Sequence, residues 1–297
     1  MRFSEYETCT LCERRCGVNR YEKLGYCRST AELLVAKAGL HKWEEPPISG
    51  TRGSGTIFFS GCSLGCVFCQ NSRISDGNVG KCISTERLAE IMLRLEDEGA
   101  HNVNLVTPTH YIPSVAEAIK AAKKQGLSIP IVYNTGSYET VEGLSLLSGL
   151  VDIYLPDLKY FLPTTAMTLS HAENYPTVAR DAIAEMFKQT GRAVLSSEGI
   201  MTRGVIVRIL LLPAHVAEAK LSLKYLYDTY GDKIYVSLMS QYTPISGMTS
   251  PLDRRVTREE YRQLTDYAER LGMKNCFVQE LSAASEDYIP DFDLSGV

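Results

Sequence analysis

The sequence lacks the features that would direct it to a membrane or to nucleic acid. No apolar run in its 297 residues approaches the length of a membrane span. Its 31 basic and 35 acidic residues leave a net charge of only −4, which gives no basic footprint for nucleic acid or an anionic membrane. The start of the sequence also lacks the apolar core of a secretion signal. We therefore expect a cytoplasmic protein with neither nucleic acid nor membrane as partner.

Cysteine is abundant and unevenly distributed. The chain has nine cysteines, and eight of them lie within the first 82 residues. Disulfides are rare in a reducing compartment, and an odd count fits a disulfide framework poorly. The pattern therefore favours metal ligation, with the isolated Cys276 as a thiol buried in the core.

The most informative group is Cys62-x-x-x-Cys66-x-x-Cys69, directly after the apolar, strand-like segment Thr56–Ser60. A [4Fe–4S] cluster has four irons, so three cysteines leave one iron free to bind a substrate. The loop glycines allow the backbone to bend around a bulky cluster. Two other interpretations remain open. The three could be buried apolar thiols, or ligands of zinc with Cys82 or His110 as the fourth.

This spacing, with Phe68 just before the third cysteine, resembles that of the radical S-adenosylmethionine (SAM) enzymes. The resemblance implies a [4Fe–4S] cluster on Cys62, Cys66 and Cys69, whose open iron chelates SAM. An electron from the cluster then cleaves SAM and yields a 5′-deoxyadenosyl radical. It also implies that Phe68 packs near the adenine. A flavodoxin or ferredoxin is expected to supply the electron.

A second group, Cys9, Cys12, Cys16 and Cys27, places four thiols within 19 residues. Four thiolates suit a closed site for zinc or an Fe–S cluster. We expect residues 1–50 to form a small cysteine-rich lobe that the metal helps to fold, because such a segment has little core of its own. Two alternatives are a loose extension with free thiols and an electron relay to the main cluster.

Beyond residue 50, strand-like and helix-like segments alternate, which predicts βαβ units and a parallel sheet. About six repeats favour an α/β fold with a partial (β/α)6 TIM-like barrel over residues 51–281, followed by a tail at 282–297. The tail could cover the barrel mouth, bind a partner, or fray. The expected strands are Thr56–Ser60, Asn102–Val106, Ile129–Tyr133, Val151–Leu155, Val205–Leu212, Ile234–Met239 and Asn275–Gln279. The expected helices lie around Leu88–Leu95, Val115–Ala122, Val141–Leu147, Thr177–Gln189, Glu218–Tyr230 and Arg258–Leu271.

Polar residues follow the expected second and third strands, where a parallel barrel places its chemistry. Thr107 and Thr109 could offer oxygen acceptors to SAM or could cap the next helix. His110 is expected to be a hydrogen-bonded structural histidine. Asn134 and Thr135 end the third strand, and their oxygens could meet a cation or the polar groups of SAM.

Charged residues follow on the next two strands. Asp157 and Lys159, two residues apart on a strand, face the same side. They could serve SAM or form a structural ion pair. Arg208 lies inside the apolar segment Val205–Leu212 and needs an anion, since a buried guanidinium is costly without one. A SAM carboxylate and an internal acidic side chain are the two candidates.

The stretches GTRGSGTIFFSGCSLGCVFCQNSRISD and VDIYLPDLKYF resemble pyruvate formate-lyase activating enzymes over about Gly53–Gln241. The resemblance implies that Asp157 helps to bind a monovalent cation beside SAM. Asn134 and Thr135 match an Asp-Thr pair of that family, with Asn in place of Asp, and Arg208 matches an arginine of the fifth strand. The cysteine-rich lobe and the Thr107–His110 turn depart from the family, which indicates a divergent branch.

The activity implied is hydrogen abstraction from a glycine of a partner glycyl radical enzyme. One alternative is a radical SAM enzyme for another macromolecule or a metabolite. The other is a non-catalytic Fe–S or zinc protein in electron transfer or assembly, which would need Cys82 to close the first site. The cleavage of SAM itself requires no acid–base residue, so we assign no catalytic residue beyond the cluster ligands.

Overall fold

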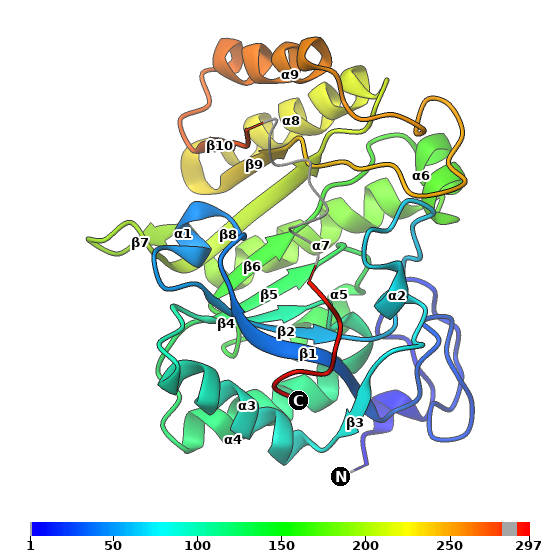
Figure 1. Ribbon diagram of the computed structural model, residues 1–297, viewed down its shortest axis with the longest axis vertical. Coiled ribbons are helices and arrows are strands. Elements are labelled where there is room, and N and C mark those ends of the chain that lie inside the picture. Colours follow the sequence, from blue (N-terminus) through cyan, green and yellow to red (C-terminus); the bar gives the residue numbers. More distant parts are fainter. Residues whose placement is uncertain (1, 281–289) are drawn as a thin grey trace.

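One open sheet runs through the molecule (Figure 1). The computed structural model describes residues 2–280 and 290–297. In these ranges ten strands are ordered β10–β9–β8–β6–β5–β4–β2–β1–β3, with β7 paired to β8. The strands are β1 (Leu33–His41), β2 (Ser54–Phe59), β3 (Lys81–Ile83), β4 (Val103–Val106), β5 (Ile131–Thr135), β6 (Ile153–Pro156), β7 (Val194–Leu195), β8 (Met201–Leu210), β9 (Tyr235–Met239) and β10 (Cys276–Val278).

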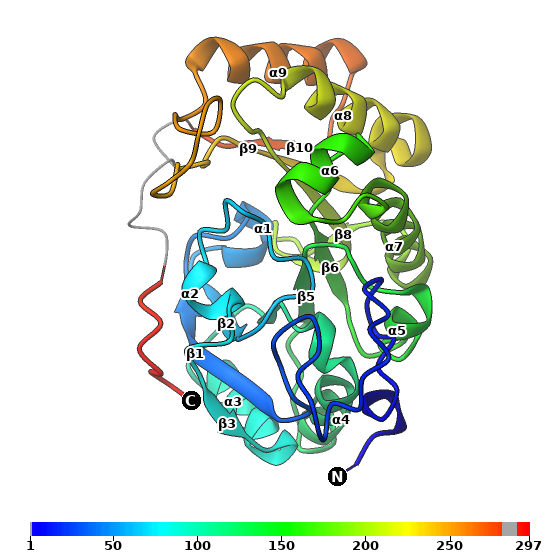
Figure 2. The same ribbon diagram turned by 90° about the vertical axis from the view of Figure 1, so that its right-hand side faces the viewer.

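In the order of the sheet, the strands β2, β4, β5, β6, β8, β9 and β10 are all parallel to their neighbours in this series. Parallel neighbours need crossover connections, which helices supply here. Figure 2 shows α5, α7 and α8 along one face of the sheet. None of the helices in the described ranges has the length and apolar character to cross a membrane. The helices are α1 (Pro46–Ser49), α2 (Ser72–Ser75), α3 (Thr85–Asp97), α4 (Ile112–Lys124), α5 (Val141–Ser145), α6 (Pro163–Ser170), α7 (Tyr175–Thr190), α8 (Val216–Tyr230) and α9 (Arg258–Leu271).

The repeat confirms the predicted fold class. Six strand–helix units follow one another in the described chain, namely β2–α3, β4–α4, β5–α5, β6–α7, β8–α8 and β9–α9, and β10 ends the series. The sheet stays open, because its end strands β10 and β3 do not pair with each other. The architecture is therefore an α/β partial barrel.

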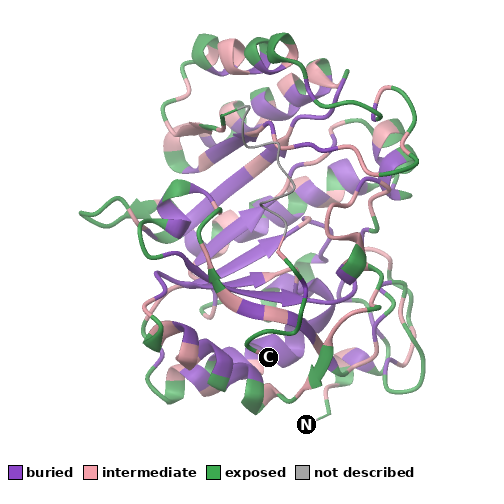
Figure 3. Cartoon of the chain, in the orientation of Figure 1, coloured by how far each residue is buried: buried purple, intermediate pink, exposed green. Residues whose placement is uncertain are grey.

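The core lies between the parallel strands and their helices. All residues of β2, β5 and β6 are buried, as expected for parallel strands covered on both faces. On α3, Leu88, Ile91, Met92 and Leu95 are buried at helical spacing, which turns the apolar stripe of the helix toward the sheet. Figure 3 shows buried strands and exposed outer helix surfaces.

Three antiparallel strands were missed by the sequence reasoning. β1 pairs with β2 and β3, and β7 pairs with β8. Lys37 and Gly39 interrupt the apolar character of β1, while β3 and β7 are too short to show a pattern. β1 lies within the range expected for the lobe and yet belongs to the main sheet. The boundary at residue 50 stays a prediction.

The N-terminal segment before β1 packs against the barrel (Figure 2). The Tyr6 hydroxyl lies 2.9 Å from that of Ser114 on α4. The Thr140 amide donates to the Leu11 carbonyl at 3.2 Å. These contacts anchor the cysteine-rich segment beside the starts of α4 and α5.

The C-terminal residues 290–297 lie along β1. Leu294 donates a backbone hydrogen bond to β1 and Ser295 accepts one, each 3.0 Å long. Phe292 is buried and packs edge-on against Phe58 with ring centroids 5.5 Å apart. This packing contradicts a frayed end for residues 290–297. The rest of the expected tail, residues 282–289, lies outside the described residues.

Thr257 and Glu260 form a capping box at the start of α9. The substitution Thr257→Ala removes the side-chain acceptor for the Glu260 amide, so we expect about 1 kcal/mol of stability to be lost in urea unfolding. Thr265→Ala, inside the same helix, is the matched control and should cause no such loss. Equal losses in the two variants would contradict the role of the cap.

Candidate functional site

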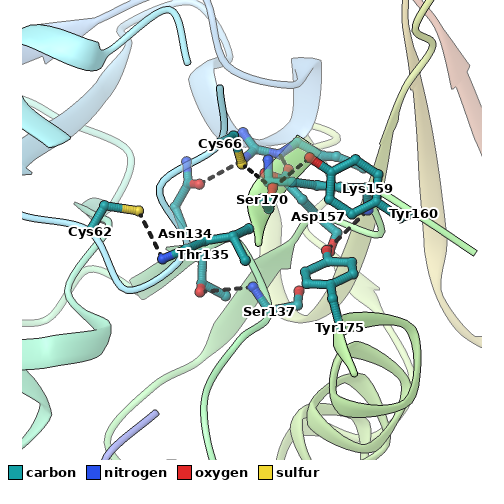
Figure 4. Close-up of polar contacts among 12 residues, drawn as sticks. Cys62, Cys66, Asn134, Thr135, Ser137, Asp157, Lys159, Tyr160, Ser170 and Tyr175 are labelled. Atoms are coloured by element: carbon teal, nitrogen blue, oxygen red, sulfur yellow. Dashed lines mark hydrogen bonds and ion pairs between the residues drawn. The ribbon is translucent and has the colours of Figure 1, made fainter. Parts of the chain in front are cut away.

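The loop after β2 carries the three predicted cluster cysteines. The Leu64 amide lies 3.4 Å from the Cys62 Sγ atom, and the Ser170 hydroxyl donates to the Cys66 Sγ atom at 3.0 Å. Figure 4 shows the contact between Ser170 and Cys66. Cys62, Cys66 and Cys69 line one cavity of about 550 Å³, a size typical of small-molecule sites.

The chemistry of these thiols fits a metal cluster. Burial, together with the neighbouring Cys62 and Cys66 thiols, raises the pKa of Cys69 to about 12. Burial likewise raises the pKa of Cys62. The Cys62 and Cys69 thiols therefore resist ionisation on their own and need positive charge nearby to become thiolates. A [4Fe–4S] cluster supplies that charge and binds each thiolate to a different iron.

The zinc alternative for this loop finds no fourth ligand. Cys82 lies on β3, is exposed, and contacts Glu32 at 3.7 Å. The His110 Nε2 atom lies 2.8 Å from the Ser60 carbonyl oxygen, and burial lowers the pKa of this histidine to about 3. His110 is therefore a structural histidine, as expected. In the described chain, no three Cys, His, Asp or Glu side chains are placed for a single metal ion.

The other cavity walls come from strand ends and from the segment between β1 and β2. Phe68 is buried there, with edge-on contacts to Tyr160 at 6.4 Å and Tyr242 at 6.0 Å. This aromatic surface suits a flat ring, in agreement with the expected adenine contact of Phe68. The contact with adenine itself stays a prediction.

The threonines at the strand ends have an internal partner that sequence reasoning did not identify. Thr109 and Thr135 both donate to the Oε1 atom of Glu139, the former at 2.5 Å. Glu139 is buried, and burial raises its pKa despite these hydrogen bonds. Thr107 lines the cavity and stays a candidate contact for SAM. Local sequence gave no sign that residue 139 folds back under the strand ends.

Arg208 forms the centre of an ionic network on the cavity wall. Its Nε atom lies 2.8 Å from Asp157 Oδ1, and one terminal nitrogen lies 2.7 Å from Asn134 Oδ1. A second terminal nitrogen lies 3.5 Å from Glu44 Oε2, and Lys159 pairs with Asp157 (Figure 4). Burial acts to raise the pKa of Asp157, but Arg208 and Lys159 outweigh it and hold the pKa below its usual value. Internal acids, Asp157 and Glu44, therefore pair with Arg208.

Glu44 and Glu45 were missed by the sequence reasoning, which searched strand ends. Both line the cavity, and burial raises the pKa of Glu45 to about 7. The Oε2 atom of Glu45 has no hydrogen-bond partner among the described residues. Three carboxyl groups thus share the centre with two cations, Arg208 and Lys159. The excess of carboxyl groups over cations suits a ligand that carries cationic groups, such as SAM.

Fold and site together define a class of protein: an open α/β barrel with a three-cysteine loop after its first parallel strand. The family model of the Radical SAM superfamily matches residues 56–206, about half of the chain. A protein of Methanocaldococcus jannaschii, described as uncharacterised, is 32% identical over 279 residues, which are 90% of this chain and 76% of that protein. The chain belongs to the radical SAM superfamily.

Solved structures share the fold. SuiB of Streptococcus suis bound to the precursor peptide SuiA has a TM-score of 0.53 and 14% identity, over 75% of this chain and 48% of that one. SuiB bound to S-adenosylmethionine also has a TM-score of 0.53, with 14% identity over 76% of this chain and 52% of that one. A radical SAM methyltransferase from Sphaerobacter thermophilus has a TM-score of 0.52, with 17% identity over 75% of this chain and 65% of that one. The chain spans about half the length of SuiB.

The placement of Cys82 leads to a first test at this site. Cys82→Ala should keep the iron and sulfide content of the anoxically reconstituted protein, because Cys82 does not line the cavity. Its electron paramagnetic resonance spectrum should still change when SAM is added. Cys69→Ala is the matched control and should lose the cluster. Loss of iron in Cys82→Ala would instead support a closed four-cysteine site.

The raised pKa of Glu45 predicts a pH-dependent stability. The folded protein binds this proton more tightly than the unfolded chain, so the contribution is complete below about pH 4.5 and is lost as pH rises toward about 7. Glu45→Gln should therefore gain up to about 3 kcal/mol relative to wild type between those pH values. Urea unfolding under anoxic conditions measures this difference in stability, and the substitution Glu173→Gln at an exposed position is the control. A difference independent of pH would contradict the prediction.

Proposed function

We propose that this chain is a radical SAM enzyme that abstracts hydrogen from a glycine of a partner protein, in the manner of glycyl-radical-enzyme activases. The observation that carries the proposal is the shared cavity, which has the three-cysteine loop on one wall and the Asp157–Arg208 centre on another. A substrate group in this cavity lies beside both the cluster ligands and the residues that would hold SAM.

The protein's residues have positioning roles in this reaction. Cys62, Cys66 and Cys69 would hold a [4Fe–4S] cluster, which supplies the electron that cleaves SAM to the 5′-deoxyadenosyl radical. The Ser170 hydroxyl donates to Cys66 and fixes its thiolate. The aromatic wall around Phe68 excludes water from a radical that would react with nearby bonds.

Asn134, Asp157, Lys159 and Arg208 would orient the polar groups of SAM, and Thr107 would add an oxygen acceptor. The internal partners of Arg208 imply that a SAM carboxylate would join this network and not replace a missing anion. A monovalent cation beside Asp157 is part of the proposal, with Asn134 offering an amide oxygen in place of a carboxylate.

A peptide or protein substrate is supported by the position of the cavity at the open side of the barrel. It is lined by residues of the segment between β1 and β2, and by β10 and Pro290, at the two ends of the parallel run. SuiB, which shares the fold, has been solved with a precursor peptide bound. A flavodoxin or ferredoxin would be the electron donor.

The test is cleavage of SAM by the reconstituted protein with dithionite under anoxic conditions. We expect 5′-deoxyadenosine to form, and its mass to rise by one unit when the candidate substrate protein carries deuterated glycine. Unlabelled product in the presence of such a substrate would instead favour a metabolite or another residue type. No product at all, from protein with intact cluster, would favour the non-catalytic alternative.

A further inference from the structure

Arg20, in the N-terminal segment, is a buried cation without a carboxylate. It is 0% exposed, the largest fully buried side chain among the described residues. Its guanidinium donates to the backbone carbonyls of Ser29, Thr30 and His110. In the part of the chain that the structure describes, we find no ion pair between Arg20 and a carboxylate. Uncompensated buried charge is expensive, so an anion is needed nearby.

The aromatic rings around Arg20 meet only part of that need. Its guanidinium carbon lies 4.7 Å from the ring centre of Tyr6 and 5.4 Å from that of Tyr111. Cation–π contacts offset some desolvation but carry no full negative charge. The acidic groups that act on Arg20 most strongly are the thiol of Cys27, the Tyr6 hydroxyl and the thiol of Cys9. Of these, only the cysteines readily become anions, when a metal binds them.

The four lobe cysteines come together around this cation. The Gly17 amide donates to the Cys9 carbonyl at 3.0 Å, which folds the Cys9–Cys16 loop back on itself. A Cβ atom at Gly25 would lie 3.2 Å from the Cys27 Sγ atom, 3.7 Å from the Cys16 Sγ atom and 3.9 Å from the Arg20 side chain. Burial raises the pKa of Cys12, and the other three thiols raise it further. Cys9, Cys16 and Cys27 are therefore near enough to act on Cys12. No three of these side chains are placed for a single metal ion in the described chain, so binding of a metal centre would draw the thiols closer together.

We propose that Cys9, Cys12, Cys16 and Cys27 bind a thiophilic metal centre as four thiolates, with Arg20 as its buried counter-ion. Four thiolates around Zn²⁺ carry a net charge of −2, and so do four around an oxidised [4Fe–4S]²⁺ cluster. Either centre supplies the anion that Arg20 lacks. The closed ligand set makes this a structural or electron-carrying site, in contrast to the open three-cysteine site.

The lobe centre is coupled to the SAM-cluster loop through the backbone. The Cys62 amide donates to the Cys27 carbonyl at 3.2 Å, so one ligand of each group shares a hydrogen bond. Arg20 bonds the His110 carbonyl, and the His110 ring bonds the Ser60 carbonyl. The lobe thus holds both residues that flank Gly61. A metal in the lobe fixes where the first cluster ligand stands.

The close packing at Gly61 shows how tightly these parts meet. Gly61 has a φ of +91°, and an added Cβ atom would lie 2.8 Å from the Cys27 carbonyl oxygen and 2.9 Å from the His110 Nε2 atom. Only glycine fits both the backbone conformation and the space.

The test uses full-length protein in which Cys62, Cys66 and Cys69 are all serine, so the lobe is measured without the SAM cluster. We expect this triple variant to retain either one zinc, or iron and sulfide with cluster absorption; the two outcomes identify the centre.

Adding Cys16→Ser, whose side chain is exposed and least needed for packing, should abolish the bound metal. Adding Cys276→Ser instead should leave it unchanged. A triple variant that binds no metal, or a metal content unaffected by Cys16→Ser, overturns the proposal. Because no SAM chemistry is involved, this result stands apart from failure of the proposed function.

The role of Arg20 is tested by Co²⁺ titration of the same triple variant, which reports thiolate coordination by its absorption. Arg20→Met should weaken Co²⁺ binding about tenfold or more, and Arg20→Lys should restore part of it. Circular dichroism of both variants checks that the chain folds. Equal affinity in folded Arg20→Met and the parent overturns the counter-ion role.

The coupling between the two sites is tested in the chain with its SAM cluster intact. There, Cys16→Ser should alter the electron paramagnetic resonance spectrum of the reduced SAM cluster, and an unchanged spectrum overturns the coupling.

Discussion

The ion pair between Arg208 and Asp157 is the constraint around which the cavity is arranged. It joins the end of β6 to β8, where the Leu158 amide also donates to the Arg208 carbonyl at 2.9 Å. Both charges are buried, so they are tolerated only with well-placed partners. Asn134 from β5 and Glu44 from the segment before β2 supply them. The network therefore fixes how the strand ends and the cavity rim meet.

The two cysteine groups differ in what their geometry allows. The loop after β2 offers three thiols to a cavity lined by polar strand ends, a site open to a substrate. The N-terminal group offers four thiols beside a buried cation and away from that cavity. Hydrogen bonds link them, from the Cys62 amide to the Cys27 carbonyl and from the Arg14 guanidinium to the Ser63 and Leu64 carbonyls. The proposed division is chemistry at the open site and support at the closed one.

Some of the candidate site was visible in the sequence because it depends on local order. The cysteine spacing, the strand before it and the pairing of Asp157 with Lys159 follow from positions close together in the chain. Glu44, Glu45 and Glu139 were not visible, because an acid in a loop is by default a surface residue. Only the packing of β1 beside β2, and the return of the chain after β5, bury these carboxyls.

The alternation of strands and helices alone determined the α/β class, since the period of apolar residues fixes which face of each element is buried. The three-cysteine motif after the first parallel strand was likewise visible in the sequence alone. Only the tertiary structure decided which anion neutralises Arg208, that Thr109 and Thr135 bind Glu139, and that Arg20 is enclosed beside the lobe cysteines. These are contacts between residues far apart in the chain, and the cost of burying charge selects them only after the chain has folded.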